Sequence, residues 1–277
     1  MRHATDSDSP DLDRPEAQLR GRGATVREFY DLLAPSYAAA ISDWDGAVDR
    51  QARVLEALIA DRVPRGSRVL DCAAGIGTQA LGLAARGYHV TATDLSSAAL
   101  DRAAAEALGR GVHLDTAVCD MRSLPDRLGT FDAVICCDNS IAHVRPDDLT
   151  RTFTSMAARL RPAGLLVLSL RDYDRHRRAR PAISAPHRSC TRDGETVALQ
   201  TWDWVDADSY VASQLLLRRR HDEDWVVDQV ADVLMHAHAR ADLARHATQA
   251  GFAVRWLSPE QTTYHQNVMV AERVVRS

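Results

Sequence analysis

Residues 68–77, RVLDCAAGIG, join a short apolar run to a loop of small residues, and a helix is predicted directly after them, from about Gly77 to Arg86. Glycine and alanine let the backbone pass close to a ligand, because little or no side chain stands in the way. In a doubly wound α/β protein such a loop lies at the carboxyl ends of the strands, where ligands bind. The stretch therefore predicts both a fold class and the place of a binding site.

Short apolar runs alternate with helical stretches through the rest of the central part of the chain. Strands separated by helices pair in parallel through right-handed crossovers, with helices on both faces of the sheet. We therefore expect an α/β fold, a Rossmann-like doubly wound sheet. The predicted strands are 68–73, 89–94, 112–120, 131–138 and 164–170, and the predicted helices are 77–86, 97–108 and 146–160.

The flanking segments have other patterns. Residues 1–22 are polar with hardly any large apolar side chain, so ordering them would bury too little surface to offset the lost entropy. Apolar positions between Thr25 and Ala60 indicate two helices, which would form a lid ahead of the core. After Pro181 the runs follow one another with short turns, which indicates an antiparallel insertion. Its predicted strands are 196–205, 210–219 and 225–234, followed by a helix at 239–250 and strands at 253–257 and 267–274.

These patterns divide the chain into five parts. They are a mobile tail (1–24), an N-terminal helical cap (25–63), the Rossmann-like core (64–180), an antiparallel insertion on the substrate side (181–236) and the end of the core sheet (237–277).

The composition excludes several partners and chemistries. The formal net charge of the 277 residues is −4, so no broad positive field would attract nucleic acid. No apolar run approaches the roughly 18 residues that a membrane span needs, and we expect a cytoplasmic protein with no membrane partner. The 34 basic residues are all arginine, because the sequence contains no lysine. Schiff-base chemistry with pyridoxal phosphate and a P-loop lysine are therefore excluded.

Cysteine and histidine give no metal-binding pattern. The five cysteines show no C-x-x-C spacing and mostly lie in apolar runs, so they are expected to be reduced packing residues. His236 and His238 lack a third ligand at a familiar spacing. We predict no metal.

Aspartates follow each of the first three core strands. Asp71 lies inside the loop of small residues, where a carboxylate would repel a pyrophosphate and attract a cationic nucleotide such as S-adenosylmethionine (SAM). Asp94 ends the second strand and is placed to accept from both hydroxyls of a ribose. Asp120 and Met121 follow the third strand, where the carboxylate would meet the amine of an adenine and the methionine would cover its ring; alternatively, Asp120 caps a helix or turn.

Several stretches of the chain resemble one enzyme family, in the family's order. They resemble the class I SAM-dependent methyltransferases, especially the glycine and glycine/sarcosine N-methyltransferases, over nearly everything after residue 25. The resemblance implies SAM as cofactor, S-adenosylhomocysteine as product and N-methylation of a small-molecule acceptor. The stretches are RVLDCAAGIGTQALGLAARGYHVTATDLS, FYDLLAPSYAAAISDWDGAVDRQ, CCDNSIAHV, SLRDYD, QTWDWVD and the closing AGF and YHQNVMVA.

The resemblance also implies roles for single residues. The family's segment that closes over the methionine part of SAM maps onto Tyr37, Trp44 and Arg50; alternatively, Arg50 is a solvated arginine on its helix. Asn139 stands where the family contacts its substrate amino acid, and Arg171 stands where it holds the substrate carboxylate. The guanidinium fork suits a carboxylate, and an arginine at the end of a core strand is costly to bury unpaired.

Arg171 also has a purely structural interpretation. It would then pair with an acidic side chain of the protein, and the candidates are Asp172, Asp174 and Asp138.

Together these observations give a predicted site. The predicted cofactor-binding residues are Tyr37, Trp44, Arg50, Asp71, Ala73, Gly75, Gly77, Asp94, Leu95, Asp120, Met121 and Cys137. The predicted substrate-binding residues are Asn139, Arg171, Tyr173 and Tyr264, and the predicted catalytic residues are Asn139, His143 and Arg171. His143 is the nearest candidate to take the proton that an ammonium acceptor must lose, although capping or packing in its loop is the favoured role.

Three other functions remain open. The acceptor could be a hydroxyl or carboxylate of a secondary metabolite, or a peptide N-terminus. The stretch Gly75 to Ala80 also matches the G-x-G-x-x-A form of dinucleotide-binding loops, which would suit a nicotinamide-dependent oxidoreductase. Asp71 and the lack of a Tyr-x-x-x-Lys pair argue against that enzyme. The chain could also bind SAM without transferring methyl groups, and it could form a homo-oligomer.

Overall fold

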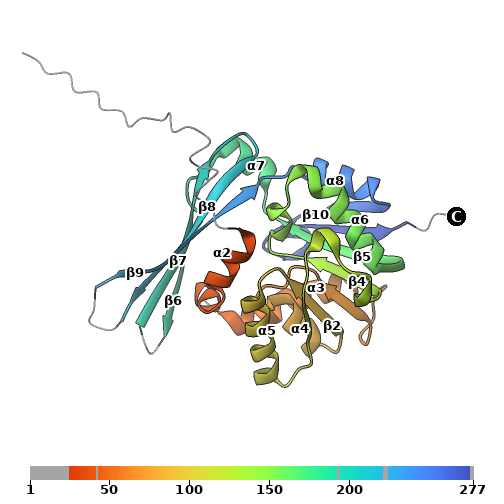
Figure 1. Cartoon of the computed structure of the whole chain (residues 1–277), viewed down its shortest axis with the longest axis horizontal. Coiled ribbons are helices and arrows are strands. Elements are labelled where there is room, and N and C mark those ends of the chain that lie inside the picture. Colours follow the sequence, from red (N-terminus) through yellow and green to blue (C-terminus); the bar gives the residue numbers. More distant parts are fainter. Residues whose placement is uncertain (1–24, 42, 192–193, 221–223, 275–277) are drawn as a thin grey trace, which may run out of the picture.

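The computed structural model describes residues 25–41, 43–191, 194–220 and 224–274. The predicted mobile tail, residues 1–24, lies outside this part of the chain. Within the described residues, two sheets and the helices packed on them form the molecule (Figure 1).

A seven-stranded sheet forms the core, as the alternating pattern predicts. Its order is β10-β11-β5-β4-β1-β2-β3. β1, β2, β3, β4 and β5 pair in parallel with one another, whereas β11 is antiparallel to both β5 and β10. The chain runs outward from β1 in both directions, so β1 and β4 meet at the switch point where such sheets bind ligands. The bounds are β1 Arg68–Asp71, β2 His89–Asp94, β3 Asp115–Val118, β4 Phe131–Cys136, β5 Leu160–Leu170, β10 Phe252–Leu257 and β11 Asn267–Arg273.

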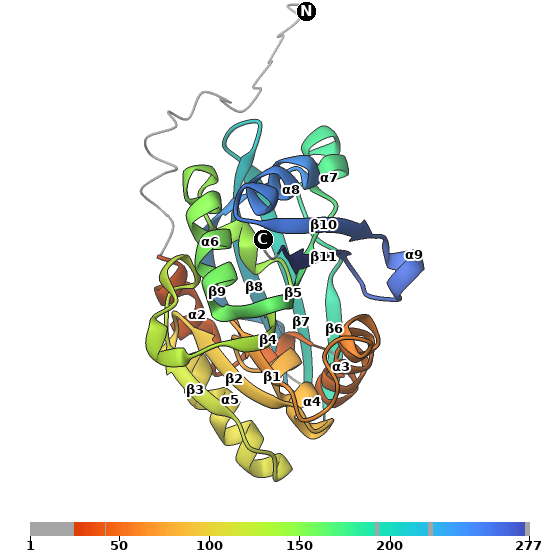
Figure 2. The same cartoon turned by 90° about the vertical axis from the view of Figure 1, so that its right-hand side faces the viewer.

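Helices cover both faces of this sheet (Figure 2). Neighbouring residues of one strand point to opposite faces. Val134 of β4 therefore packs with α6 and α8, and Ala133 packs with α3, α4 and α5. The bounds are α3 Trp44–Ile59, α4 Thr78–Ala85, α5 Ser97–Arg110, α6 Leu149–Arg159 and α8 Arg240–Gln249. Short 3₁₀ helices connect the elements, at η1 Tyr37–Ala40, η2 Met121–Ser123, η3 Asp126–Leu128, η4 Ser140–His143 and η5 Pro146–Asp148.

The predicted insertion is a second, antiparallel sheet in the order β6-β7-β8-β9. Its long strands extend beyond the core on one side of the molecule (Figure 1). The sequence predicted three of these strands and missed the short edge strand β6, because HRSCT has no apolar alternation. The bounds are β6 His187–Thr191, β7 Gly194–Trp204, β8 Ser209–Arg219 and β9 Val226–His236.

The N-terminal helix α2, Val26–Leu33, lies between the insertion sheet and the core (Figure 1). Thr25 begins it with a capping box, in which its hydroxyl accepts from the backbone N–H of Glu28. Phe29 and Leu33 are buried in the main core, and Arg27 Nε donates to the carbonyl of Leu95 at 3.2 Å. These contacts hold the helix over the carboxyl edge of the parallel strands.

Two short helices were not predicted. They are α7, Tyr173–Ala179, directly after β5, and α9, Pro259–Thr262, before β11. Each begins with a side chain that caps the first turn, Asp172 for α7 and Ser258 for α9. No helix among the described residues is long and apolar enough to cross a membrane.

Candidate active site

A cavity of about 180 Å³ lies at the carboxyl edge of β1, β2 and β4, where the loop of small residues predicted it. We name it the cofactor cavity. The predicted residues that line it are Tyr37, Ala73, Gly75, Asp94, Leu95, Asp120, Met121 and Cys137. Trp44, Arg50, Asp71 and Gly77 do not line it.

Asp94 fixes the loop of small residues to the second strand. Its Oδ2 accepts from the backbone N–H of Gly75 at 2.8 Å and its Oδ1 accepts from the N–H of Ser96 at 2.9 Å. Burial raises the pKa of Asp94, although these N–H donors oppose the rise. Each carboxylate oxygen can accept a further hydrogen bond, so the predicted contact with a ribose fits this geometry.

Asp71 differs from the prediction. It ends the central strand β1, between Ala92 of β2 and Ile135 of β4, and its side chain is fully buried beneath the loop. Ala73 donates a long hydrogen bond to its Oδ1, 3.4 Å, whereas its Oδ2 has no partner in the structure. Burial raises the pKa of Asp71 to about 8. Asp71 does not line the cofactor cavity, so its predicted effect on a cationic ligand stays a prediction.

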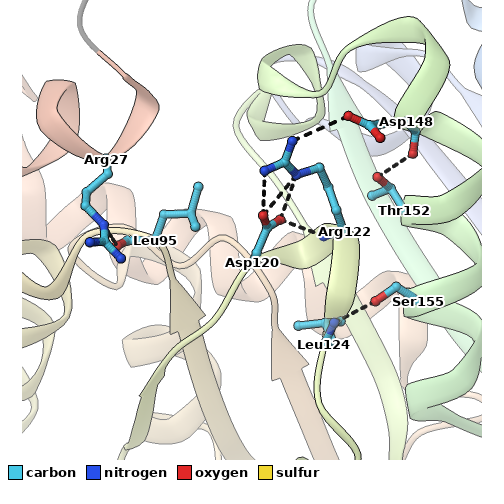
Figure 3. A network of polar contacts seen from close by, with 8 residues as sticks. All are labelled: Arg27, Leu95, Asp120, Arg122, Leu124, Asp148, Thr152 and Ser155. Atoms are coloured by element: carbon cyan, nitrogen blue, oxygen red, sulfur yellow. Dashed lines mark hydrogen bonds and ion pairs between the residues drawn. The ribbon is translucent and has the colours of Figure 1, made fainter.

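Asp120 lies at the far end of the cavity, and most of its hydrogen-bonding capacity is taken by Arg122 (Figure 3). Arg122 Nη2 donates to Oδ2 of Asp120 at 2.7 Å, and the backbone N–H of Arg122 donates to Oδ1 at 2.8 Å. Burial alone would raise the pKa of Asp120, but the Arg122 guanidinium outweighs it and lowers the pKa. Asp148 accepts from the same guanidinium at 3.4 Å. The carboxylate is therefore ionised, and its predicted contact with adenine stays a prediction.

Three further predicted cofactor residues have other places. Trp44 packs in the apolar clusters beside the loop. Arg50 lines a second cleft, and its Nη1 donates to Oδ2 of Asp43, the N-cap of its own helix, at 2.7 Å. Gly77 has a φ of 92°, a left-handed conformation that suits glycine, and caps α4. The helix register and the local ion pair decide the place of Arg50, and neither is visible in the sequence alone.

His143 lines the cofactor cavity, where its Nε2 lies 2.9 Å from the hydroxyl of Tyr30. Burial lowers the pKa of His143 to about 4. The imidazole is therefore neutral at pH 7 and a poor base for an ammonium proton. Tyr30 lines the same cavity and was not predicted.

A larger cleft of about 1100 Å³ adjoins the cofactor cavity. It lies between α3, η1, the insertion sheet and the residues before β11. Tyr37 and Asp138 line both spaces, so the two meet at these side chains. We name the larger space the acceptor cleft. Of the predicted substrate residues, Arg171 and Tyr264 line it.

Arg171 has no carboxylate partner among the described residues. Its Nη2 donates to Oε1 of Gln200 at 3.1 Å and its Nη1 to the hydroxyl of Tyr210 at 3.4 Å, and its guanidinium lies over the ring of Trp202. The candidates for an internal ion pair have other roles. Asp172 caps α7, Asp174 pairs with Arg240, and Asp138 pairs with His265. None of the three internal ion pairs considered for Arg171 is present among the described residues, and Arg171 lines the cleft.

Asn139 and Tyr173 differ from the prediction, because both are buried and neither lines the cofactor cavity or the acceptor cleft. Asn139 Oδ1 accepts from the backbone N–H of Arg171 at 3.2 Å, and its Nδ2 donates to the Tyr173 hydroxyl at 2.8 Å. That hydroxyl lies 2.7 Å from the hydroxyl of Tyr210, which holds the guanidinium of Arg171. Asn139 and Tyr173 thus position Arg171 from behind and do not contact the cleft.

The chain is similar in sequence to known methyltransferases. Residues 69–164 match the family model of a methyltransferase domain. The glycine/sarcosine N-methyltransferase of Halorhodospira halochloris is 33% identical over 140 residues, 48% of this chain and 52% of that protein. The enzyme of the same name from Parasynechococcus marenigrum is 34% identical over 135 residues, 48% of this chain and 47% of that protein. The chain thus spans about half the length of the curated relatives it matches.

A solved structure extends the likeness of fold over the whole chain. The sugar N-methyltransferase KedS8 from Streptoalloteichus superposes with a TM-score of 0.65 at 21% identity, over 99% of this chain and 100% of that one. The chain therefore contains a methyltransferase domain, and its fold is that of the class I SAM-dependent methyltransferases.

The cofactor cavity fits SAM, the cofactor of that class. Its lining carries the carboxylates of Asp94, Asp120 and Asp138, and its one arginine, Arg122, is already paired. The unpartnered Oδ2 of Asp71 lies beneath it. An excess of carboxylate suits a sulfonium and an ammonium and opposes a pyrophosphate. The dinucleotide alternative therefore loses its support.

Proposed function

We propose that this chain is a SAM-dependent N-methyltransferase whose acceptor is a small amine that also carries a carboxylate, as an amino acid does. One observation carries this proposal. Arg171 presents a guanidinium without a carboxylate partner to a cleft that adjoins the cofactor cavity. A partly buried guanidinium without a carboxylate partner is costly, and an anion of the ligand would offset that cost. The names of the two curated relatives support the same class of acceptor.

The donors of Arg171 allow a two-point contact with a carboxylate. A guanidinium has five N–H donors, and the structure uses two of them, on Gln200 and Tyr210. The remaining donors suffice for the bidentate geometry that a carboxylate prefers. Asn139 and the two tyrosine hydroxyls fix the arginine in this orientation. The acceptor would then be held at one end, with its amine directed to the junction at Tyr37.

The residues of the chain contribute mainly position. SAM, when bound, supplies an electrophilic methyl group on a sulfonium centre. Asp94 would hold the ribose, and the backbone from Ala73 to Gly75 leaves room for the rest of the nucleotide. Helix α2 lines the cofactor cavity through Val26 and Tyr30, and Tyr37 lies at the junction, so these residues would limit the access of water to the reacting groups. The acceptor would lose one proton to water before the transfer, and its neutral nitrogen would then form the bond to the methyl group as the methyl–sulfur bond breaks. Because the sulfonium becomes a neutral thioether, alignment would contribute more to this step than a strong base.

An acceptor panel tests this proposal. The purified chain is incubated with SAM and with amino acids, amines without a carboxylate, hydroxy acids and amino sugars, and the formation of S-adenosylhomocysteine is followed by mass spectrometry. We expect turnover with amines that carry a carboxylate. Methyl transfer only to hydroxyls or to amines without a carboxylate would contradict the proposal. Calorimetry with NAD is the control for the cofactor, and tight binding of NAD would contradict the assignment to SAM.

A further inference from the structure

Asp138 is a carboxylate at the junction of the cofactor cavity and the acceptor cleft, and it has no part in the function proposed so far. We propose that Asp138 is the subsite for the ammonium group of the acceptor. The acceptor is then held at two points of opposite charge, its ammonium at Asp138 and its carboxylate at Arg171. This inference rests on the proposed function, because it concerns the orientation of the same acceptor.

The backbone conformation that places Asp138 at the junction is strained. Asp138 follows β4 with a φ of 53°, and Asn139 follows with a φ of 71°, so two successive residues other than glycine are left-handed. Such strain persists only where the surroundings fix it, and it is concentrated at functional sites. Here the N–H of Asp138 donates to Oγ of Ser169 at 2.7 Å. The turn sends Asn139 inward behind Arg171 and leaves Asp138 in the wall of both spaces.

Neutral side chains and one histidine orient the Asp138 carboxylate. Oδ1 accepts from the hydroxyl of Tyr264 at 2.8 Å and lies 3.2 Å from Nε2 of His265, and Oδ2 accepts from Nε2 of Gln79 at 2.7 Å. A carboxylate can accept about four hydrogen bonds, so a place remains for a ligand on Oδ2. The side chain is 32% exposed, and its exposed part faces the two spaces it lines.

The charge of Asp138 is available to a cation. Burial alone would raise the pKa of Asp138, but hydrogen bonds from His265, Tyr264 and Gln79 outweigh it, and the pKa lies below its ordinary value. The carboxylate is therefore ionised at neutral pH. No arginine is paired with it in the described residues. The contact with His265 is at Oδ1, so Oδ2, which accepts from Gln79, can still accept from an ammonium group.

The acceptor is the ligand that can use both charges. Asp138 and Arg171 line one cleft and carry opposite charges, which suits a zwitterion with an amine and a carboxylate. The ammonium of SAM is the competing ligand, because Asp138 also lines the cofactor cavity. The two ligands differ in what they bind besides Asp138, so separate affinities distinguish them.

Crossed inhibitors test the inference on the full chain. A short carboxylic acid without an amine and a short alkylamine without a carboxylate are measured as inhibitors competitive with the acceptor. We expect Asp138→Asn to raise the inhibition constant of the alkylamine by about tenfold or more and that of the acid by less than about twofold. Arg171→Ala should do the reverse. The affinity for SAM, measured by calorimetry, should stay within about threefold in Arg171→Ala, and in Asp138→Asn it should fall by less than the affinity for the alkylamine, because Asp138 also lines the cofactor cavity.

Two further variants complete the test, one as a second removal of the charge and one as a control. Asp138→Gly removes the charge and also relieves the left-handed strain, so it should fold even if the asparagine variant does not. Asp172→Asn is the matched control, because it removes a nearby carboxylate that caps α7 and lines neither space. Asparagine retains the cap, so both inhibition constants should be unchanged.

The outcomes separate this inference from the proposed function. If the wild-type chain methylates no amine that carries a carboxylate, the proposed function fails before any variant is compared. If the wild type does methylate such an amine, two results would show that the ammonium subsite is wrong while the proposed function stands. One is an unchanged inhibition constant of the alkylamine in Asp138→Asn, and the other is a larger loss of affinity for SAM than for the alkylamine.

Discussion

Replacing Arg171 by alanine should reduce kcat/KM for the acceptor by about 30- to 1000-fold. The estimate assumes loss of one to two charge-assisted hydrogen bonds to the acceptor carboxylate, about 2–4 kcal/mol in all. The fold should survive, because no carboxylate loses its partner. The Tyr210 hydroxyl keeps Tyr173 as a partner, and Oε1 of Gln200 still accepts from Nε1 of Trp202.

Steady-state kinetics and calorimetry check this expectation together. The affinity for SAM should change little, because Arg171 does not line the cofactor cavity. Arg171→Lys retains the charge without the planar fork and should recover only part of the loss. An acceptor analogue with an amide in place of its carboxylate should lose affinity for the wild type and lose nothing further in the variant. Two results would refute the assignment. One is an equal loss of affinity for SAM and for the acceptor, and the other is a variant that loses as much affinity as the wild type when the carboxylate of the acceptor is replaced by an amide.

Four further expectations follow from the structure. Asn139→Ala should raise the KM for the acceptor and leave the affinity for SAM nearly intact, since its side chain holds Arg171 and lines neither space; a proportionate loss of SAM binding, by calorimetry, would count against this. Asp94→Ala should abolish measurable SAM binding because the Gly75 loop loses its acceptor, and an unchanged dissociation constant would contradict it. The pKa of Asp71 is about 8, and a bound cation favours the ionised carboxylate, so SAM binding should release a proton. The affinity of the wild type for SAM should therefore rise, relative to that of Asp71→Asn, as the pH rises toward 8. If the affinities of the two proteins changed with pH in parallel, this coupling would be excluded. Gly82→Ala should lower the melting temperature by about 2–10 °C, because its Cβ would lie 2.5 Å from Cβ of Ala52 and 2.5 Å from the carbonyl oxygen of Val48, whereas Gly109→Ala has open space and should raise it slightly.

The sheet, its order of helices and strands, and the place of the cofactor cavity follow from patterns that the sequence carries locally. Alternating apolar runs and helical spacing predicted every strand of the core. Strand β6 and helices α7 and α9 were missed because they are short, and edge pairing or a capping side chain, with no apolar period, stabilises them.

Side-chain direction was harder to predict than position. Asp71 ends the correct strand, but pairing on both sides of β1 buries it beneath the loop. The arginine at position 50 is drawn to Asp43, the N-cap of its own helix, and away from the cofactor. The backbone of Asn139 has a left-handed conformation, and its side chain therefore lies behind Arg171. Asp138 was not predicted as a ligand, although an Asp-Asn pair after a buried strand is typical of a left-handed turn and was its one visible signal.

The most direct measurement is a single-turnover reaction of the chain with methyl-labelled SAM and a panel of amino acids, with the products identified by mass spectrometry. The account predicts label on the nitrogen of an acceptor that carries a carboxylate, with one S-adenosylhomocysteine formed for each methyl transferred. Label on oxygen only, or bound SAM that no amine with a carboxylate ever consumes, would contradict it.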